Sequence, residues 1–265
     1  MRKALIAVPI LLLVGCLLAY AKFVYARLAY NFIVLPENGQ ILYESGAEDL
    51  AKLAAAELPA GMGKIERLQN LPFKDRKAIK VYIFNDRNHY ANFSNAPAVT
   101  LGSSTTDEVY LSEKLRETTD AFSSILIHEL SHIHIRQYTG TFKYIKDIPG
   151  WFLEGLAVSV SSGEGAGDVT AEQAQAAIRG GMRFEPDDSG RIIGPKTAHN
   201  YGLEPRMYYR QAGLFVDYLR KVNPQAFEAA LVGVINGISF REVWPTYYGR
   251  TILELWQSFE RTIQA

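Results

Sequence analysis

Five consecutive residues of this chain, His128-Glu129-Leu130-Ser131-His132, have the types and the spacing of a metal-dependent hydrolytic site. Two histidines four residues apart project from the same face of an α-helix, so their imidazoles can bind one metal ion. The glutamate between them lies beside that ion, where its carboxylate can accept a proton from a metal-bound water molecule. The pentapeptide therefore predicts zinc-dependent hydrolysis, with His128 and His132 as ligands and Glu129 as general base.

A catalytic zinc ion needs a third protein ligand, and the sequence offers a carboxylate at a suitable place. Glu154 follows His132 by 154 − 132 = 22 residues and stands in the apolar run 151–157. A lone carboxylate in such a run is costly to bury unless a positive group meets it. We therefore expect Glu154 to complete the ligand set.

Two helices must bring these ligands together. The run that contains the pentapeptide predicts a helix over residues 121–138, which Gly140 would end, and apolar residues surround the pentapeptide on most sides. A second apolar helix over residues 150–159 would carry Glu154. The turn between them, residues 139–149, would allow the second helix to fold back onto the first.

The pentapeptide and the run Trp-Phe-Leu-Glu-Gly-Leu-Ala at residues 151–157 together resemble the gluzincin metallopeptidases, in particular the peptidase MA-like group. The second run is also similar to the W-L-N-E-G-F-A element of related aminopeptidases. The resemblance covers most of residues 39–262, although outside the two motifs it is one of pattern. It implies a zincin-like fold with Zn²⁺ bound by His128, His132 and Glu154, and with Glu129 as general base and proton shuttle.

The same resemblance implies a tyrosine or histidine that donates a hydrogen bond to the oxyanion of the tetrahedral intermediate. We expect Tyr209 in this role, from its place at the start of a helix, and Tyr208 and His199 are the alternatives. Leu153 replaces the asparagine of the aminopeptidase element, and the chain has no G-x-M-E-N stretch of the kind that holds a free amino terminus. An endopeptidase is therefore favoured over an aminopeptidase.

The remaining elements follow from periodicity and from turn residues. Strands are predicted at residues 40–43, 78–84 and 108–112, and further helices at 48–58, 206–221, 224–236 and 251–263. Residues 59–63 would end the first of these helices, and residues 97–107 and 181–205 read as loops. We expect the strand 108–112 to form the sheet edge that aligns an extended peptide.

Composition excludes some classes of partner and site. The chain of 265 residues has 28 basic and 28 acidic side chains, so it lacks the basic surplus that nucleic-acid binding needs. Cys16 is the single cysteine, which excludes disulfides within the chain and cysteine-based metal sites.

Residues 1–35 are predicted to be a membrane anchor or signal segment, because residues 4–21 are apolar and follow Arg2 and Lys3. A cleaved signal peptide is one alternative, since Ala-Tyr-Ala at residues 19–21 is a small-x-small site. A lipoprotein signal is the other, since Leu-Val-Gly-Cys at residues 13–16 resembles a lipobox and would be modified at Cys16. Each places the main domain, residues 36–265, outside the cytoplasm.

The sequence thus predicts an α+β, zincin-like fold. A small mixed sheet with helices (about 36–140) would precede a mainly helical C-terminal lobe (about 141–265), with the active site between them. The predicted function is hydrolysis of a peptide or protein substrate by a membrane-tethered or exported zinc metallopeptidase. The alternative is a non-catalytic module of the same fold that binds a partner at the cell envelope.

Overall fold

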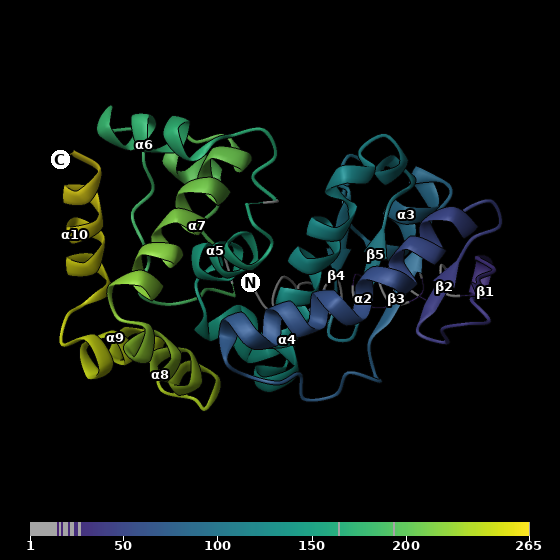
Figure 1. Ribbon diagram of the computed structural model, residues 1–265, viewed down its shortest axis with the longest axis horizontal. Coiled ribbons are helices and arrows are strands. Elements are labelled where there is room, and N and C mark those ends of the chain that lie inside the picture. The colour runs from purple at the N-terminus through teal and green to yellow at the C-terminus, as the bar shows by residue number, and fades with distance from the viewer. Residues whose placement is uncertain are drawn as a thin grey trace, which may run out of the picture.

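The chain folds into a small mixed sheet with helices, followed by a mostly helical remainder, as the α+β prediction requires (Figure 1). The computed structural model describes residues 28–163, 165–192 and 194–264, together with residues 15, 17, 21, 24 and 25. Buried apolar residues form two large cores, one around the sheet and one among the C-terminal helices. The two cores meet on the helix Phe122–Asp147, because Ile133 belongs to the core around the sheet and Ile135 to the helical core. The molecule therefore consists of two lobes that share this helix.

The N-terminal lobe is built on a five-stranded sheet with the order β1-β2-β3-β5-β4. Strands β2, β3 and β5 are parallel, whereas β1 and β4 run antiparallel to their neighbours at the two edges. The strands are β1 (Ile33–Val34), β2 (Ile41–Tyr43), β3 (Lys80–Ile83), β4 (Gly102–Ser104) and β5 (Glu108–Leu111).

The predicted sheet edge was wrong. Strand β5 lies inside the sheet between β3 and β4, so it cannot offer a free edge to a peptide. The edge on this side is β4, within residues 97–107, which we had interpreted as a loop. Its sequence is Gly-Ser-Ser, which lacks the β-branched and aromatic residues that mark a strand.

Helix α2 (Glu48–Gln69) is longer than predicted, because residues 59–63 do not end it and Pro59 lies inside the helix. The second half buries Met62 and Ile65 in the core, and this burial outweighs the poor helix propensity of the segment. An ideal Cβ at Gly61 would lie 3.1 Å from Ile127 Cγ1, so glycine allows α2 to approach the helix that carries the pentapeptide closely.

Helix α4 (Phe122–Asp147) carries the pentapeptide and comprises two helical segments. Gly140 divides them, with φ 70° and ψ 158°, a conformation that only glycine adopts readily. The break that we predicted at Gly140 is therefore present, but the chain resumes a helix directly after it. The second segment leads into α5 (Gly150–Val160), which carries Glu154.

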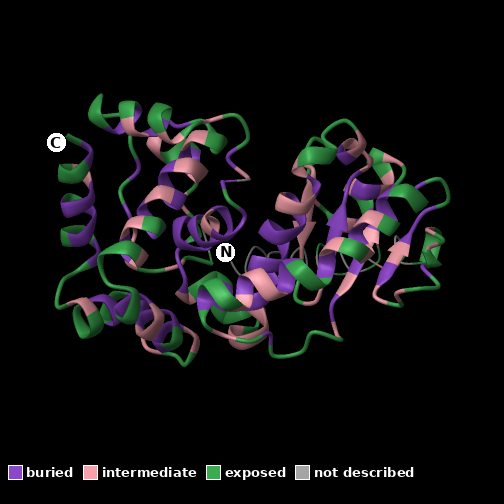
Figure 2. Cartoon of the chain, viewed as in Figure 1, coloured by how far each residue is buried: buried purple, intermediate pink, exposed green. Residues whose placement is uncertain are grey.

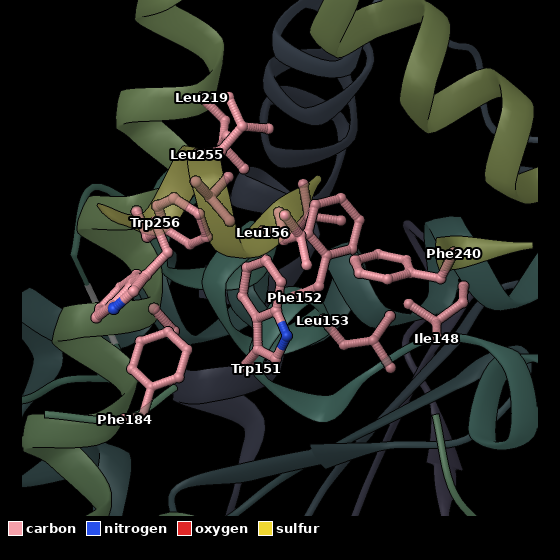
Figure 3. Packing of buried hydrophobic residues seen from close by; sticks show 14 of the residues in the cluster. Ile148, Trp151, Phe152, Leu153, Leu156, Phe184, Leu219, Phe240, Leu255 and Trp256 are labelled. Atoms are coloured by element: carbon pink, nitrogen blue, oxygen red, sulfur yellow. The ribbon is translucent and has the colours of Figure 1, made fainter. Parts of the chain in front are cut away.

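The C-terminal lobe is helical, and its long helices were predicted, whereas α6 and α9 were not. Figure 3 shows the buried aromatic and aliphatic side chains that hold it together, among them Trp151, Phe152 and Trp256. Its helices after α5 are α6 (Ala171–Arg179), α7 (Pro205–Val222), α8 (Pro224–Ile235), α9 (Phe240–Tyr248) and α10 (Ile252–Gln264). The remaining helices are α3 (Arg87–Ser94) and the 3₁₀ turns η1 (Glu113–Arg116), η2 (Thr119–Ala121) and η3 (Ala198–Tyr201).

Glycines set the position of α5 against α7. An ideal Cβ at Gly155 would lie 2.7 Å from Ala212 O, and one at Gly213 would lie 2.5 Å from Val158 Cγ1. The two helices thus pack at a distance that larger residues would not permit. Because Gly155 follows Glu154 directly, this packing also fixes the position of the Glu154 backbone, from which the carboxylate extends.

The N-terminal segment is only partly described. Within the described residues, no helix combines the length and the apolar character needed to cross a bilayer. The predicted anchor, signal and lipobox alternatives, including Cys16, fall on residues that lie largely outside the described ones. The chain joins the sheet from β1 onward, where Ile33 pairs with Tyr43 and Val34 with Leu42.

Candidate metal centre

The three predicted ligands converge at the junction of the two lobes, where α5 and the first segment of α4 are mostly buried (Figure 2). His132 Nε2 lies 3.2 Å from His128 Nε2. Glu154 Oε2 lies 3.4 Å from His128 Nε2 and 3.7 Å from His132 Nε2. These three donor atoms could hold a metal ion.

The environment keeps these donors in the protonation states that a metal needs. Burial lowers the pKa of His132 to about 3, so its imidazole is neutral at neutral pH. Burial alone would raise the pKa of Glu154, but the hydrogen bond with His128 and the charge of Arg136 oppose it and the pKa is lowered, so the carboxylate is ionised. A metal ion requires both a neutral imidazole and an ionised carboxylate as ligands.

The side chain of Glu129 extends from α4 to the edge strand β4. Its carboxylate accepts a hydrogen bond from Ser104, and an ideal Cβ at Gly102 would lie 3.3 Å from Glu129 Oε1. Burial raises the pKa of Glu129, with a further small contribution from the charge of Glu154. The Glu129 side chain is thus a buried carboxylate that is held against β4, on the same helix as His128 and His132.

Tyr144, which the sequence analysis missed, orients one of the ligands. Its hydroxyl lies 2.9 Å from His132 Nδ1, on the far side of the imidazole from the other donors. The Arg136 guanidinium carbon lies 4.3 Å from the centroid of the Tyr144 ring, and Arg136 also donates a hydrogen bond to Thr105 O. If His132 Nε2 binds a metal, Nδ1 would carry the proton and donate a hydrogen bond to the Tyr144 hydroxyl oxygen, which would fix the ring orientation.

Three alternating glycines, which we call the glycine turn (Gly163, Gly165 and Gly167), lie against side chains from other elements. All three have positive φ. An ideal Cβ at Gly165 would lie 2.5 Å from His128 Cε1 and 2.7 Å from His128 Nδ1, so this turn covers the imidazole of His128 directly. Gly167 faces the flexible side chain of Arg206 instead.

The candidate oxyanion donors lie in different surroundings. Tyr209 is half-buried, and the charges of Glu154 and Glu129, together with burial, raise the pKa of its hydroxyl. Tyr208 is buried, and its ring stacks on Tyr201 with a centroid distance of 5.9 Å. His199 is exposed in η3. Of the three, Tyr209 is the partly accessible tyrosine whose hydroxyl pKa is raised by both carboxylates of the site.

His134 lies away from the ligands and has a structural role. Its Nδ1 contacts Gln69 Oε1 at 2.5 Å, and its Nε2 lies 3.1 Å from Leu71 O. It is fully buried and joins α4 to the end of α2.

No protein-family model and no curated protein matches this chain.

The glycine turn generates the first prediction. Gly165→Ala should weaken metal binding at least about tenfold, because a methyl group would displace the His128 ring, and displaced ligand partners cost affinity on this scale. The measurement is a titration of the purified metal-free chain with Zn²⁺, together with the absorption spectrum of its Co²⁺ complex.

Gly181→Ala is the matched control, because its φ of 85° is close to the 88° of Gly165 and nothing lies within 4 Å of an ideal Cβ there. It should leave the affinity close to that of the unaltered chain. If the two variants lose affinity equally, the contact with His128 is irrelevant and backbone strain explains both.

The second prediction concerns Tyr144. Tyr144→Phe keeps the ring beneath Arg136 but removes the acceptor for His132 Nδ1–H, so the affinity for Zn²⁺ should fall about 10–100-fold. Tyr138→Phe is the control. It removes a hydroxyl group on the same helix, and this hydroxyl donates a hydrogen bond to Pro72 O. Competition with a chelator measures both, and equal affinities in the two variants would contradict the role of Tyr144.

Proposed function

We propose that this protein is a zinc-dependent peptidase of the zincin type, and more specifically an endopeptidase. The observation that carries the proposal is the spacing of the three donor atoms, at 3.2, 3.4 and 3.7 Å. Donors bound tetrahedrally to zinc at about 2.0–2.1 Å lie roughly 3.3 Å apart from one another. Two imidazoles and one carboxylate also match the usual donor set of a catalytic zinc site with one open position.

Bound zinc would supply the Lewis acidity that peptide hydrolysis requires. Glu129 would accept the proton of the attacking water and deliver it to the leaving amine. Its burial supports this role, because a carboxylate with a raised pKa holds a transferred proton better than an exposed one. Tyr209 would donate a hydrogen bond to the oxyanion, a role supported by the charges of Glu154 and Glu129, which raise the pKa of its hydroxyl and keep it protonated.

The edge strand β4 would align the substrate. Among the described strands, β4 pairs with β5 alone, so its other edge can pair with an extended peptide. Ser104 of this strand donates to Glu129, which places the strand beside the proposed base. A peptide bound there would therefore lie along the metal centre, and pairing through the main chain would not require a free terminus.

A membrane-tethered or exported location remains part of this proposal. It rests on the apolar run 4–21 behind Arg2 and Lys3.

The third prediction tests the metal. The purified full-length chain should contain one zinc ion, and Glu154→Ala should lose it, with a drop in affinity larger than the roughly 10–100-fold that an outer partner costs. Elemental analysis after dialysis gives the stoichiometry. Unchanged zinc content in the variant would remove Glu154 from the ligand set, and absence of zinc from both proteins would refute the proposed function.

The fourth prediction separates a peptidase from a non-catalytic binding module. Glu129→Gln should retain zinc but reduce kcat for blocked peptides by about 10²–10⁴-fold, the usual contribution of a general base. Glu129 does not belong to the ligand group, so zinc content serves as the internal control for folding. Equal turnover by the variant and the unaltered chain would show that Glu129 is not the base, and no turnover by either would favour the binding module.

A further inference from the structure

A cavity of about 510 Å³, partly open to solvent, lies between the second segment of α4, residues 188–189 and the turn that joins α8 to α9. Small-molecule sites in proteins commonly enclose about 300–1,000 Å³, so this volume is that of a ligand site. The three donor residues of the metal centre do not line it, and neither does Glu129. The proposed chemistry of the metal centre therefore leaves this space unused.

The inner wall of the cavity is apolar, and we call it the apolar floor (Ile148, Val234, Ile238 and Phe240). Ile148, Val234 and Phe240 are buried and belong to the core of the C-terminal lobe, and Ile238 is half-buried against that core (Figure 3 labels Ile148 and Phe240). Core packing thus fixes the shape of the floor. A ligand with an apolar body gains free energy by covering it.

The volume limits the size of that body. An apolar cavity of about 150 Å³ holds benzene, so a partly open cavity more than three times as large holds roughly 10–20 non-hydrogen atoms. A single ring with a short alkyl chain fits within this range.

The outer wall carries charged side chains, and one of the positive charges is unmatched. Both carboxylates already have a partner: Asp188 Oδ2 lies 2.6 Å from Arg241 Nε, and Asp147 Oδ1 lies 3.9 Å from Lys146 Nζ. Lys143 also lines the cavity, and within the described part of the chain no carboxylate lies within ion-pair distance of its ammonium group. The cavity wall therefore has a net positive charge.

The first turn of α9 adds to this charge. Ser239 is the N-cap of the helix, and both Phe240 and Arg241 at its start line the cavity. The partial positive charge at a helix N-terminus favours an anion. Together with the free ammonium group of Lys143, it makes the entrance complementary to a negatively charged group above an apolar floor.

We propose that this cavity binds a small amphiphilic carboxylate, a molecule with one apolar body and one carboxylate group. The apolar body covers the floor at Ile148, Val234 and Phe240, and the carboxylate lies beside Lys143. This site goes beyond the proposed peptidase function and does not depend on it. It lies on the same segment of α4 that carries Tyr144, but on residues that do not contact the metal ligands.

The experiment measures binding of 4-phenylbutyrate to the full-length chain by isothermal titration calorimetry. Two further compounds separate the contributions, since 4-phenylbutyramide has the same body without the charge and acetate has the charge without the body. Phenylbutyrate should bind at one site, and the amide should bind about threefold more weakly or worse, as an exposed ion pair and a helix N-terminus together contribute. Acetate should show no measurable binding, because it does not cover the floor.

Lys143→Gln should remove the preference for the carboxylate, so that phenylbutyrate and the amide bind equally. Lys74→Gln is the matched control, because Lys74 is an exposed lysine between α2 and β3 that does not line the cavity, and it should keep the preference. Ile238→Ala should weaken both compounds by the same factor, about threefold or more, because it removes part of the floor.

Absence of phenylbutyrate binding to the unaltered chain would overturn the proposal. Equal affinities for phenylbutyrate and the amide, or an unchanged preference in Lys143→Gln, would overturn it as well. Unchanged affinities in Ile238→Ala would show that the compounds bind elsewhere. None of these outcomes changes the expected zinc content, so failure of this site is distinguishable from failure of the metal centre.

Discussion

The candidate metal centre depends on one contact, the approach of the Glu154 carboxylate on α5 to the two imidazoles on α4. Several features fix that distance. Gly140 breaks α4 so that the chain can return, and Gly155 lets α5 lie directly against α7. The donor atoms thus come from two helices, of which α4 contributes side chains to both large cores and α5 packs mainly in the core of the C-terminal lobe.

Burial of these groups also determines their chemistry. An ionised carboxylate inside a protein is costly unless positive or polar groups surround it. Here Arg136 supplies a positive charge near Glu154, Glu129 and Tyr144 at once, and its side chain is held by the Tyr144 ring and by Thr105 O. One arginine a single helical turn after His132 therefore adds a positive charge beside these groups and ties α4 to Thr105, the residue directly after β4.

The features that depend on local periodicity were predictable from the sequence. Few of the features that depend on contacts between distant segments of the chain were. The four-residue spacing of His128 and His132 fixes a shared helix face, and the apolar surroundings of Glu154 indicate a buried partner, so the convergence of these three was predictable. Tyr144 was not, because its contact with His132 exists only after Gly140 redirects the chain. Strand β4 was missed because Gly-Ser-Ser has low strand propensity and forms its pairs only with β5 in place. Residues 59–63 failed to end α2 because tertiary burial outweighs the local cost of Pro59.

The short edge strand has a consequence for solubility. An open strand edge that can pair with a substrate can equally pair with another copy of the chain, and long apolar edges promote aggregation for this reason. β4 has three small residues, none of them strongly apolar, and the antiparallel pairing ends at Ser104. Such an edge is too short and too polar to hold a second sheet unaided. Lengthening it with β-branched residues would be expected to convert the proposed substrate-binding edge into a self-association site.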